Sequence, residues 1–552
     1  MKKLYLFIFL GTFLFSLSAI GQKTVVVVEP DEGLEIGALN AAIAEVETAG
    51  TGDNTIFELK RDGLYLLNGT ISHSGYTLHI RAEAGEGTKP VLQPAVDELG
   101  ESGRQFEPAG HLTLEGLYLQ GRDELGQINV QPIRVMADEC KILIDSCVLD
   151  YAAQSLVRTS SGNNIIKITN SILRNSILPD NPSNGRVIDS RGNPNDTLWI
   201  SNSTIYNNGA TQLRSDGGAT NFANFDHNTV YQTSFNHNFA LDYIFKANVT
   251  NNIFYNFLYR GDNTGHEPFF ALDSIFGSEI DEYSDANRYF DLSNNNWYVQ
   301  PEIGEILDEF GPDTLYRLND WDTEHADTIW YRETLRTNWF ASDSLLELDQ
   351  PEVPDIIAFI QNEQVDTTGL FREELNFKNP PPLNLEYWKF YTENGWEISG
   401  MNPPSPYADE DPDVMGEVTE GAFDFSYNAN SRSATAADEG LPLGDPRWVP
   451  YEVVSAPKIS ANRNIPVSTY PNPFKTQVSF SIDSKEAANL IIKVYNLVGQ
   501  ELFSVTDNIA AGNSKLDVSM HEIKYPGVYL YNIYFETISG AKYLSTGKII
   551  KE

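Results

Sequence analysis

A short phrase recurs between residues 141 and 257, and the spacing of its copies constrains the fold more than any other feature. Each copy has an apolar run, then a polar pair, then a bulky residue. The copies contain, in order, Ser146, Asn170, Asn202, His227 and Asn251, at separations of 24, 32, 25 and 24 residues. A repeat of this length is one supersecondary unit, which can bury its apolar face only against its neighbours.

The runs inside each unit are short and rich in β-forming residues, with no helical period. The unit is too short for a four-stranded propeller blade and lacks a leucine-rich pattern. We therefore predict a parallel β-helix with three short strands per coil, in which the longest separation reflects a loop insertion. Asparagine tolerates left-handed backbone, so we predict that Asn170, Asn202 and Asn251 stack as an amide ladder inside a tight turn. The alternative places these side chains on the surface.

The N-terminal segment predicts export from the cytoplasm. A charged start, the apolar run 4–15 and the small residues of 19–21 are typical of a secretory signal peptide over residues 1–21. No later apolar run is long enough to span a bilayer, so we expect no transmembrane segment. Residues 34–46 have the pattern of an amphipathic helix, which we expect to cap the first coil.

The balance of charge limits the partners that the chain can bind. Lys and Arg number 38 against 77 Asp and Glu, for a net charge of −39. This excess disfavours nucleic acid as a partner, because a phosphate backbone would be repelled. It permits calcium binding, and it permits an acidic glycan only where positive charge gathers locally. Cys140 and Cys147 lie seven residues apart on an extended run, too far for a disulfide.

The C-terminal third contains two further regions. Residues 300–450 are acidic, contain proline and are rich in tryptophan, which indicates coil insertions and a C-terminal cap completing a β-helix domain over 22–450. Residues 451–466 form a linker. Residues 467–552 begin near the run Tyr470–Phe474, continue with alternating strands and end in Lys548–Glu552. They closely resemble the sorting domain of the type IX secretion system, an immunoglobulin-like β-sandwich. The resemblance implies type IX secretion machinery as a partner and a cell-surface or extracellular location.

The first coils carry a second resemblance. The runs 65–70, 78–83, 89–92 and 114–117 resemble the opening coils of the polysaccharide lyase family that includes chondroitinase B and alginate lyases. They also resemble β-helix proteins common in the Bacteroidetes. The resemblance covers roughly residues 25–260 and implies a right-handed parallel β-helix that acts on an acidic polysaccharide.

A second set of strands lies between the repeated phrases and carries ionisable side chains. Aligned coil by coil, Arg158, Asp189, Arg214 and Asp242 form a column, and Arg191 follows Asp189 on the same face. One interpretation is a salt-bridge ladder on a solvated face. The other is a glycan-binding cleft, in which Arg158, Asp242 and His227 bind the substrate.

The resemblance to the lyases implies catalytic roles within this column. Residues 188–191 are similar to the segment that carries the base of the lyase family, and 212–217 to the segment that carries its assisting arginine. The comparison puts Arg191 at the base position and makes Arg214 the acid or charge stabiliser, with Asp189 beside them. Elimination from a uronate requires a base, an acid and neutralisation of the carboxylate.

This chain departs from the lyase pattern in two ways. Arginine is a poor base because it stays protonated near neutral pH. The paired glutamates that bind calcium in the family correspond here to Asn184 and Arg186, so we predict no metal ligands and leave a calcium requirement open. His227 and His237 are alternative bases.

Two functional hypotheses follow. In the first, a secreted or surface protein acts on acidic polysaccharide, through lyase β-elimination or through hydrolysis by paired carboxylates from Asp189, Asp216 and Asp242. In the second, the same scaffold is a non-catalytic glycan-binding or adhesive protein. Fold alone does not separate them.

Overall fold

The computed structural model describes most of the first 260 residues and selected segments after them. The described residues are 23–32, 36–215, 217–233, 239–241, 243–257, 270–271, 287–310, 314–316, 329–331, 363–394, 398–407, 423–448, 467–484, 486–496, 501–537 and 542–552. The chain forms two compact units, one within residues 1–450 and one within 451–552. The predicted signal peptide and linker lie outside the described residues.

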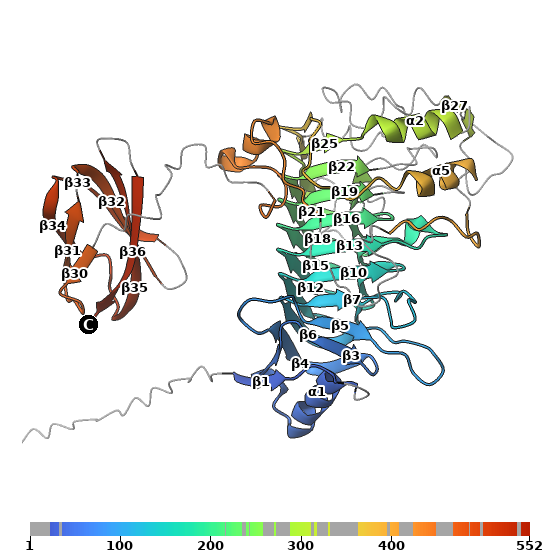
Figure 1. Cartoon of the computed structure of the whole chain (residues 1–552), viewed down its shortest axis with the longest axis horizontal. Helices are drawn as coiled ribbons and strands as arrows, with labels where there is room; N and C mark the ends of the chain where they lie inside the picture. The colour runs from blue at the N-terminus through green and yellow to red at the C-terminus, as the bar shows by residue number, and fades with distance from the viewer. Residues whose placement is uncertain are drawn as a thin grey trace, which may run out of the picture. The chain divides into compact units, whose positions relative to one another are not determined.

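The first unit is a stack of parallel coils (Figure 1), and its strands form three ladders that run the length of the stack. Ladder 1 contains the first halves of β4 (Ile71–Ala82) and β6 (Phe106–Glu115), then β8 (Ile133–Val135), β11 (Ser155–Thr159), β14 (Arg186–Asp189), β17 (Leu213–Arg214), β20 (Phe239–Ala240) and β23 (Phe270–Ala271). Ladder 2 contains β1 (Thr24–Val28), β2 (Thr55–Leu59), the second halves of β4 and β6, β9 (Lys141–Asp145), β12 (Asn164–Thr169), β15 (Asn195–Ser201), β18 (Thr220–Asp226), β21 (Ile244–Thr250), β24 (Tyr289–Asp291) and β28 (Val365–Asp366).

Ladder 3 completes each coil. It contains β3 (Leu64–Leu67), β5 (Val91–Pro94), β7 (Tyr118–Gln120), β10 (Val148–Ala152), β13 (Ile172–Ser176), β16 (Thr204–Asn208), β19 (Thr229–Thr233), β22 (Ile253–Phe257), β25 (Asn296–Tyr298) and β29 (Phe371–Arg372). From β8 onward the chain passes through ladders 1, 2 and 3 in turn. These parallel sheets fit the predicted β-helix with three strands per coil.

Alternation along each strand decides which side chains form the core. In β15, for example, Leu198 and Ile200 are fully buried, whereas Trp199 between them is only partly buried. The inward-facing residues of successive coils lie over one another and form one continuous apolar cluster from Val28 to Val365.

The corner between ladders 2 and 3 explains the repeated phrase. Ser146, Asn170, Asn202, His227 and Asn251 all occupy it with left-handed backbone, at φ between 51° and 59°. The left-handed turn predicted from the asparagines is therefore present. The predicted amide ladder through Asn170, Asn202 and Asn251 is wrong, because the stacked side chains belong to the following residue in each coil.

The stacked polar side chains at this corner are buried, and Asn228, Asn252 and Asn295 are at most 2% exposed. The backbone N–H of Asn228 donates to Asn252 Oδ1 at 2.8 Å, and that of Asn252 donates to Asn295 Oδ1 at 2.9 Å. Two coils earlier, serines continue the ladder, since Ser171 N–H donates to Ser203 Oγ and Ser203 N–H to Asn228 Oδ1. These side chains accept hydrogen bonds from backbone donors that would otherwise be buried without partners.

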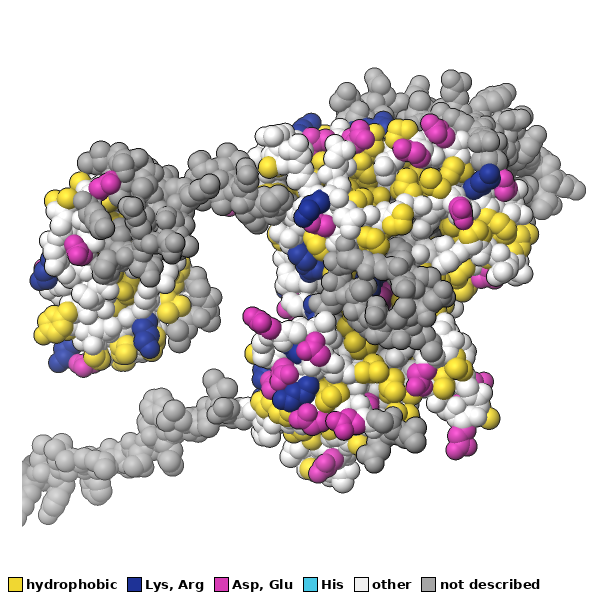
Figure 2. Space-filling view, in the orientation of Figure 1, with side chains coloured by type: hydrophobic (Ala, Val, Ile, Leu, Met, Phe, Trp, Pro, Cys, Tyr) yellow, Lys and Arg dark blue, Asp and Glu magenta, His cyan; other side chains and the backbone are white. Residues whose placement is uncertain are grey.

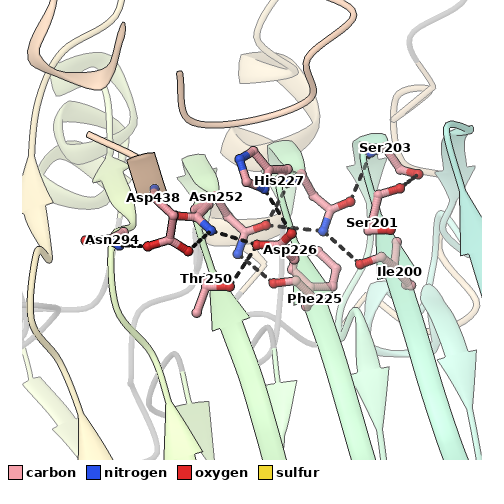
Figure 3. A network of polar contacts seen from close by, with 12 residues as sticks. Ile200, Ser201, Ser203, Phe225, Asp226, His227, Thr250, Asn252, Asn294 and Asp438 are labelled. Atoms are coloured by element: carbon pink, nitrogen blue, oxygen red, sulfur yellow. Dashed lines mark hydrogen bonds and ion pairs between the residues drawn. The ribbon is translucent and has the colours of Figure 1, made fainter. Parts of the chain in front are cut away.

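A C-terminal segment of this unit returns along ladder 3. The outer residues of β10, β13, β16, β19 and β22 are buried, because apolar residues from 371–448 pack over them. Polar contacts hold the segment at the corners: Asp438 accepts from Asn251 Nδ2 at 3.2 Å and from Asn294 Nδ2 at 3.0 Å (Figure 3). Other elements of this unit are α2 (Pro301–Phe310), β26 (Thr314–Tyr316), β27 (Ile329–Tyr331) and α5 (Leu385–Glu393).

The predicted cap helix begins later than expected. Helix α1 spans Ala38–Ala49 rather than 34–46. Gly37 has φ 87°, and Asp31 Oδ1 accepts the N–H of Ala38 at 2.9 Å. A carboxylate supplied from seven residues upstream therefore caps the helix, and a left-handed glycine sets its start.

The second unit is antiparallel. One sheet contains β30 (Val467–Tyr470), β31 (Gln477–Ser484) and β34 (Gly512–Ser519). The other contains β33 (Glu501–Ile509), β32 (Ala488–Tyr495), β35 (Gly527–Thr537) and β36 (Lys542–Lys551). Residues from both sheets, such as Phe480 and Ile533, share one buried cluster.

We expect Asn252→Ala to destabilise the β-helix, because the buried N–H of Asn228 and the C=O of Phe225, both in the preceding coil, lose their side-chain partner. Each such group costs about 1–3 kcal/mol of unfolding free energy. Chemical denaturation measures the change. Asn252→Ser is the matched control, since serine fills this position at Ser171 and Ser203, and it should lose less. Equal stability of Asn252→Ala and wild type would contradict a stabilising role for the ladder.

Candidate functional site

The candidate site is the outer face of ladder 1. Its inward positions carry apolar core residues such as Ile133, Val157 and Ile188, so the residues that follow them point outward. The pairing register aligns Arg134 with Arg158, Arg158 with Asp189, and Asp189 with Arg214. Three of the four residues in the column predicted from the sequence are therefore neighbours.

The fourth member of that column was predicted wrongly. Ala240, not Asp242, pairs with Arg214. The register follows the core, because fully buried Phe239 lies beside Leu213. Asp242 itself lies outside the described residues, as do His237 and Asp216, so one of the two alternative bases and two of the three carboxylates proposed for hydrolysis are not placed.

Asp189 sits between two arginines. Its carboxylate lies 3.6 Å from an Arg186 terminal nitrogen and 3.5 Å from an Arg214 terminal nitrogen, and only 2% of its side chain is exposed. A buried carboxylate needs such partners, since removing the charge from water costs several kcal/mol. This end of the column is therefore an electrostatically compensated cluster, and it holds the Arg214 guanidinium in place.

Three other arginines lack such compensation. Arg134, Arg158 and Arg191, here called the arginine patch, make no ion pair with any described carboxylate. Arg134 donates only to Ser160 Oγ, at 2.7 Å. Burial, and then the positive charge of Arg191, lowers the pKa of Arg158; Arg134 and Arg104 add to the effect, and Asp189 opposes it. A bound anion would relieve this repulsion.

The arginine patch was only partly found from the sequence. Arg191 lies at an exposed turn with φ 47°, after the end of β14 rather than within a strand. Arg134 and Arg104 were missed. The signal for Arg134 was present, because Ile133–Val135 repeats the pattern of an arginine between two β-branched residues seen in Val157–Thr159 one coil later. Arg104 pairs with Glu107 at 3.0 Å.

The other two faces differ from ladder 1. On ladder 2 the basic residues of the first coils have carboxylate partners: Lys60 with Glu83 at 3.1 Å, and Arg81 with Glu58 at 2.7 Å. Figure 2 shows basic and acidic side chains intermixed over these coils. The middle strands of ladder 3 are covered by apolar residues of 371–383 and 423–448. The arginine patch is therefore a feature of one face.

His227 lies at a different corner of the coil. It follows β18, a seven-residue strand about 20 Å long, which separates it from Arg214 and β17. Its Nδ1 contacts Asp226 Oδ2 at 2.9 Å, and Asp226 also accepts from Thr250 and Asn251 (Figure 3). The structure does not bring His227 to the arginine column.

The described residues offer no evident metal site. No group of three or more His, Cys, Asp or Glu side chains among them is placed to bind a metal ion. Asn184 and Arg186, which the sequence resemblance aligned with calcium-binding glutamates, contact each other, since Asn184 Oδ1 accepts from Arg186 at 3.4 Å. A guanidinium there would repel a cation.

Comparison with known proteins identifies the C-terminal unit. Residues 468–552 match the family model described as the secretion system C-terminal sorting domain. This type IX sorting domain indicates secretion across the outer membrane to the cell surface or the extracellular space, and it implies contact with the secretion machinery. No curated protein matches the chain significantly. None of the helices in the described segments is long and apolar enough to cross a membrane.

We expect His227→Asn to be nearly neutral, because asparagine occupies the same left-handed corner at Asn170, Asn202 and Asn251. The unfolding free energy should change by no more than about 0.5 kcal/mol. Chemical denaturation measures the stability of the variant, and a polysaccharide-binding assay measures its binding, which should also be unchanged. Normal unfolding combined with a selective loss of binding would instead place His227 in the binding site.

Proposed function

We propose that this secreted or cell-surface protein binds and acts on acidic polysaccharide along the outer face of ladder 1. In this proposal residues 22–450 form a right-handed parallel β-helix related to the chondroitinase B and alginate lyase family. Residues 467–552 form an immunoglobulin-like sandwich that serves export, with residues 451–466 as the linker. A non-catalytic glycan-binding protein is the minimal form of the proposal.

One observation carries the proposal: the arginine patch is uncompensated in a chain whose net charge is −39. Arg134 and Arg158 lie on adjacent strands, about 4.8 Å apart between backbones. Like charges opposite each other destabilise a sheet, so this arrangement favours an anionic ligand as the missing partner. Carboxylate and sulfate groups of a polysaccharide suit guanidinium groups, which bind such anions in a planar, two-pronged geometry.

An extended polymer fits this face better than a small anion does. Each coil advances about 4.8 Å, so Arg134 and Arg158 offer cationic positions on adjacent coils of ladder 1, and Arg214 offers a third two coils beyond Arg158. Nucleic acid is a less suitable polymer, because the whole chain would repel its backbone. Secretion also brings the protein to glycans rather than to nucleic acid.

We expect Arg158→Ala to weaken binding to alginate, pectate, chondroitin or ulvan, whichever binds the wild-type chain. A charge-assisted hydrogen bond contributes about 1.5–3 kcal/mol, or roughly ten- to hundredfold in affinity. Calorimetry at two salt concentrations measures the loss. Lys141→Ala removes the same charge from an exposed position on ladder 2 and should have little effect. Equal losses of affinity in the two variants would indicate non-specific electrostatic attraction rather than a binding site at Arg158.

Lyase β-elimination is a second candidate. Its support is the Asp189 cluster, which holds the Arg214 guanidinium on the outer face where it could neutralise a uronate carboxylate. Arg191 would then stand at the base position, with its exposed turn next to Arg158.

We expect the lyase candidate to reveal itself through ultraviolet absorbance of an unsaturated product. The full chain would be incubated with alginate, pectate, chondroitin and ulvan, with and without calcium. A product that Arg214→Ala abolishes, while Lys141→Ala retains it, would establish elimination at this face. Binding without any product on these polymers would leave the non-catalytic form of the proposal for them.

A further inference from the structure

A cleft of about 790 Å³ opens at the first coils of ladder 1. One wall is the end of α1 with the 3-10 turn Gly52–Asn54, and the floor comes from β4 and β6. Met136 lies at its edge, two residues beyond Arg134 and hence on the same side of the strand. The cleft therefore adjoins the arginine patch but has its own lining.

The lining is rich in hydrogen-bond acceptors. Glu47 accepts from Tyr76 at 3.0 Å, Asp53 accepts from the N–H of Thr77 at 2.9 Å, and Glu107 pairs with Arg104 at 3.0 Å. Each of these carboxylates uses one oxygen in the contact, and the second oxygen has no hydrogen-bond partner among the described residues. Ser72 and Ser74 add exposed hydroxyls.

His73 supplies an independent observation. It lines the cleft, is 4% exposed, and its Nε2 contacts the backbone oxygen of His111 at 2.8 Å. A carbonyl accepts, so Nε2 carries the proton. Burial lowers the pKa of His73, which keeps the ring neutral. Nδ1 is then a bare acceptor, buried and without a partner in the described part of the chain. A buried acceptor in this state favours a ligand that donates.

A flat aromatic wall completes the cleft. The Tyr76 ring lies 5.0 Å from the His73 ring, between centroids. Gly52 permits this placement, because a Cβ there would stand 2.6 Å from the Tyr76 ring. The ring face offers apolar surface beside the polar groups.

We propose that this cleft is a separate subsite for a sugar residue that is rich in hydrogen-bond donors and carries no negative charge. Hydroxyls or an ammonium group would donate to Glu47, Asp53 and His73, while the ring of the sugar lies against Tyr76. The carboxylates repel an anionic residue from this position. The choice of a sugar rests on the proposed function, but the preference for donors rests on the lining alone.

The test uses saturation-transfer NMR on the full chain with three monosaccharide probes: methyl glucoside, glucosamine and glucuronate. We expect transfer to methyl glucoside or glucosamine, and little to glucuronate. A response to both indicates hydroxyl donors, and a response to glucosamine alone indicates the ammonium group. Ala109→Trp fills the cleft, and His73→Phe keeps a ring while removing the acceptor. Ala109→Trp should abolish the transfer because it fills the cleft, whereas His73→Phe should weaken binding about tenfold, as expected for one lost hydrogen bond.

Two controls separate this inference from the proposed function. Arg158→Ala should leave the methyl glucoside and glucosamine signals unchanged, and thermal unfolding shows whether each variant is folded. Absence of transfer to these two probes, equal transfer to glucuronate that Ala109→Trp removes, or signals from the two probes that persist in folded Ala109→Trp would overturn the subsite. Monosaccharide binding without any polysaccharide binding would overturn the proposed function and leave the subsite standing.

Discussion

The in-register stacking of parallel coils is the interaction on which the rest of the structure depends. A strand such as β12 has one neighbour on each side, so Ile166 pairs with Ile142 and with Leu198. The corners have no strand partners, and there the chain turns through a left-handed residue. The following side chain then accepts the backbone N–H of the adjacent coil, as Asn252 does for Asn228. At the corners, the polar ladder thus supplies the hydrogen-bond partners that backbone pairing supplies along the strands.

The same register aligns outward-facing side chains in columns, and the charge and the coverage of these columns differ among the three ladders. Ladder 2 pairs opposite charges in its first coils, and the middle strands of ladder 3 are covered by apolar residues of 371–383 and 423–448. Ladder 1 leaves like charges side by side at Arg134 and Arg158. Because the fold stacks equivalent positions coil after coil, outward residues of like charge can lie side by side, and the pair Arg134 and Arg158 attracts an anion more strongly than a single arginine does.

Much of this architecture could be predicted, because the repeat spacing is a direct trace of the coil. The amide ladder was misplaced by one residue for a physical reason. The left-handed Asn170 turns outward and donates to Asp145 of the previous coil at 2.7 Å, while its neighbour Ser171 faces inward. The inward column mixes Cys147, serine and asparagine, so it has no single-residue signature. Contacts such as Asp438 with Asn251 join residues far apart in sequence and leave no local pattern. Phe239 and Leu241 are both buried in the core, so burial alone did not show which of them pairs with Leu213, and the structure pairs Phe239.

The outer face of ladder 1 contains both arginines that have a carboxylate partner and arginines that lack one, and this difference favours a bound ligand. The chain has carboxylates in excess, and at Asp189 it uses one to hold two arginines. One coil away it places Arg158 beside Arg134 and leaves both without such a partner, although partial burial makes the charge more costly. The cleft lined by Glu107 has the opposite imbalance, because its hydrogen-bond acceptors outnumber the donors available to them. Arg158 and Glu107 lie two coils apart, or about 10 Å. A ligand that satisfied both would present an anion at one point and donors at the next, which describes a polymer of unlike residues better than a uniform polyanion.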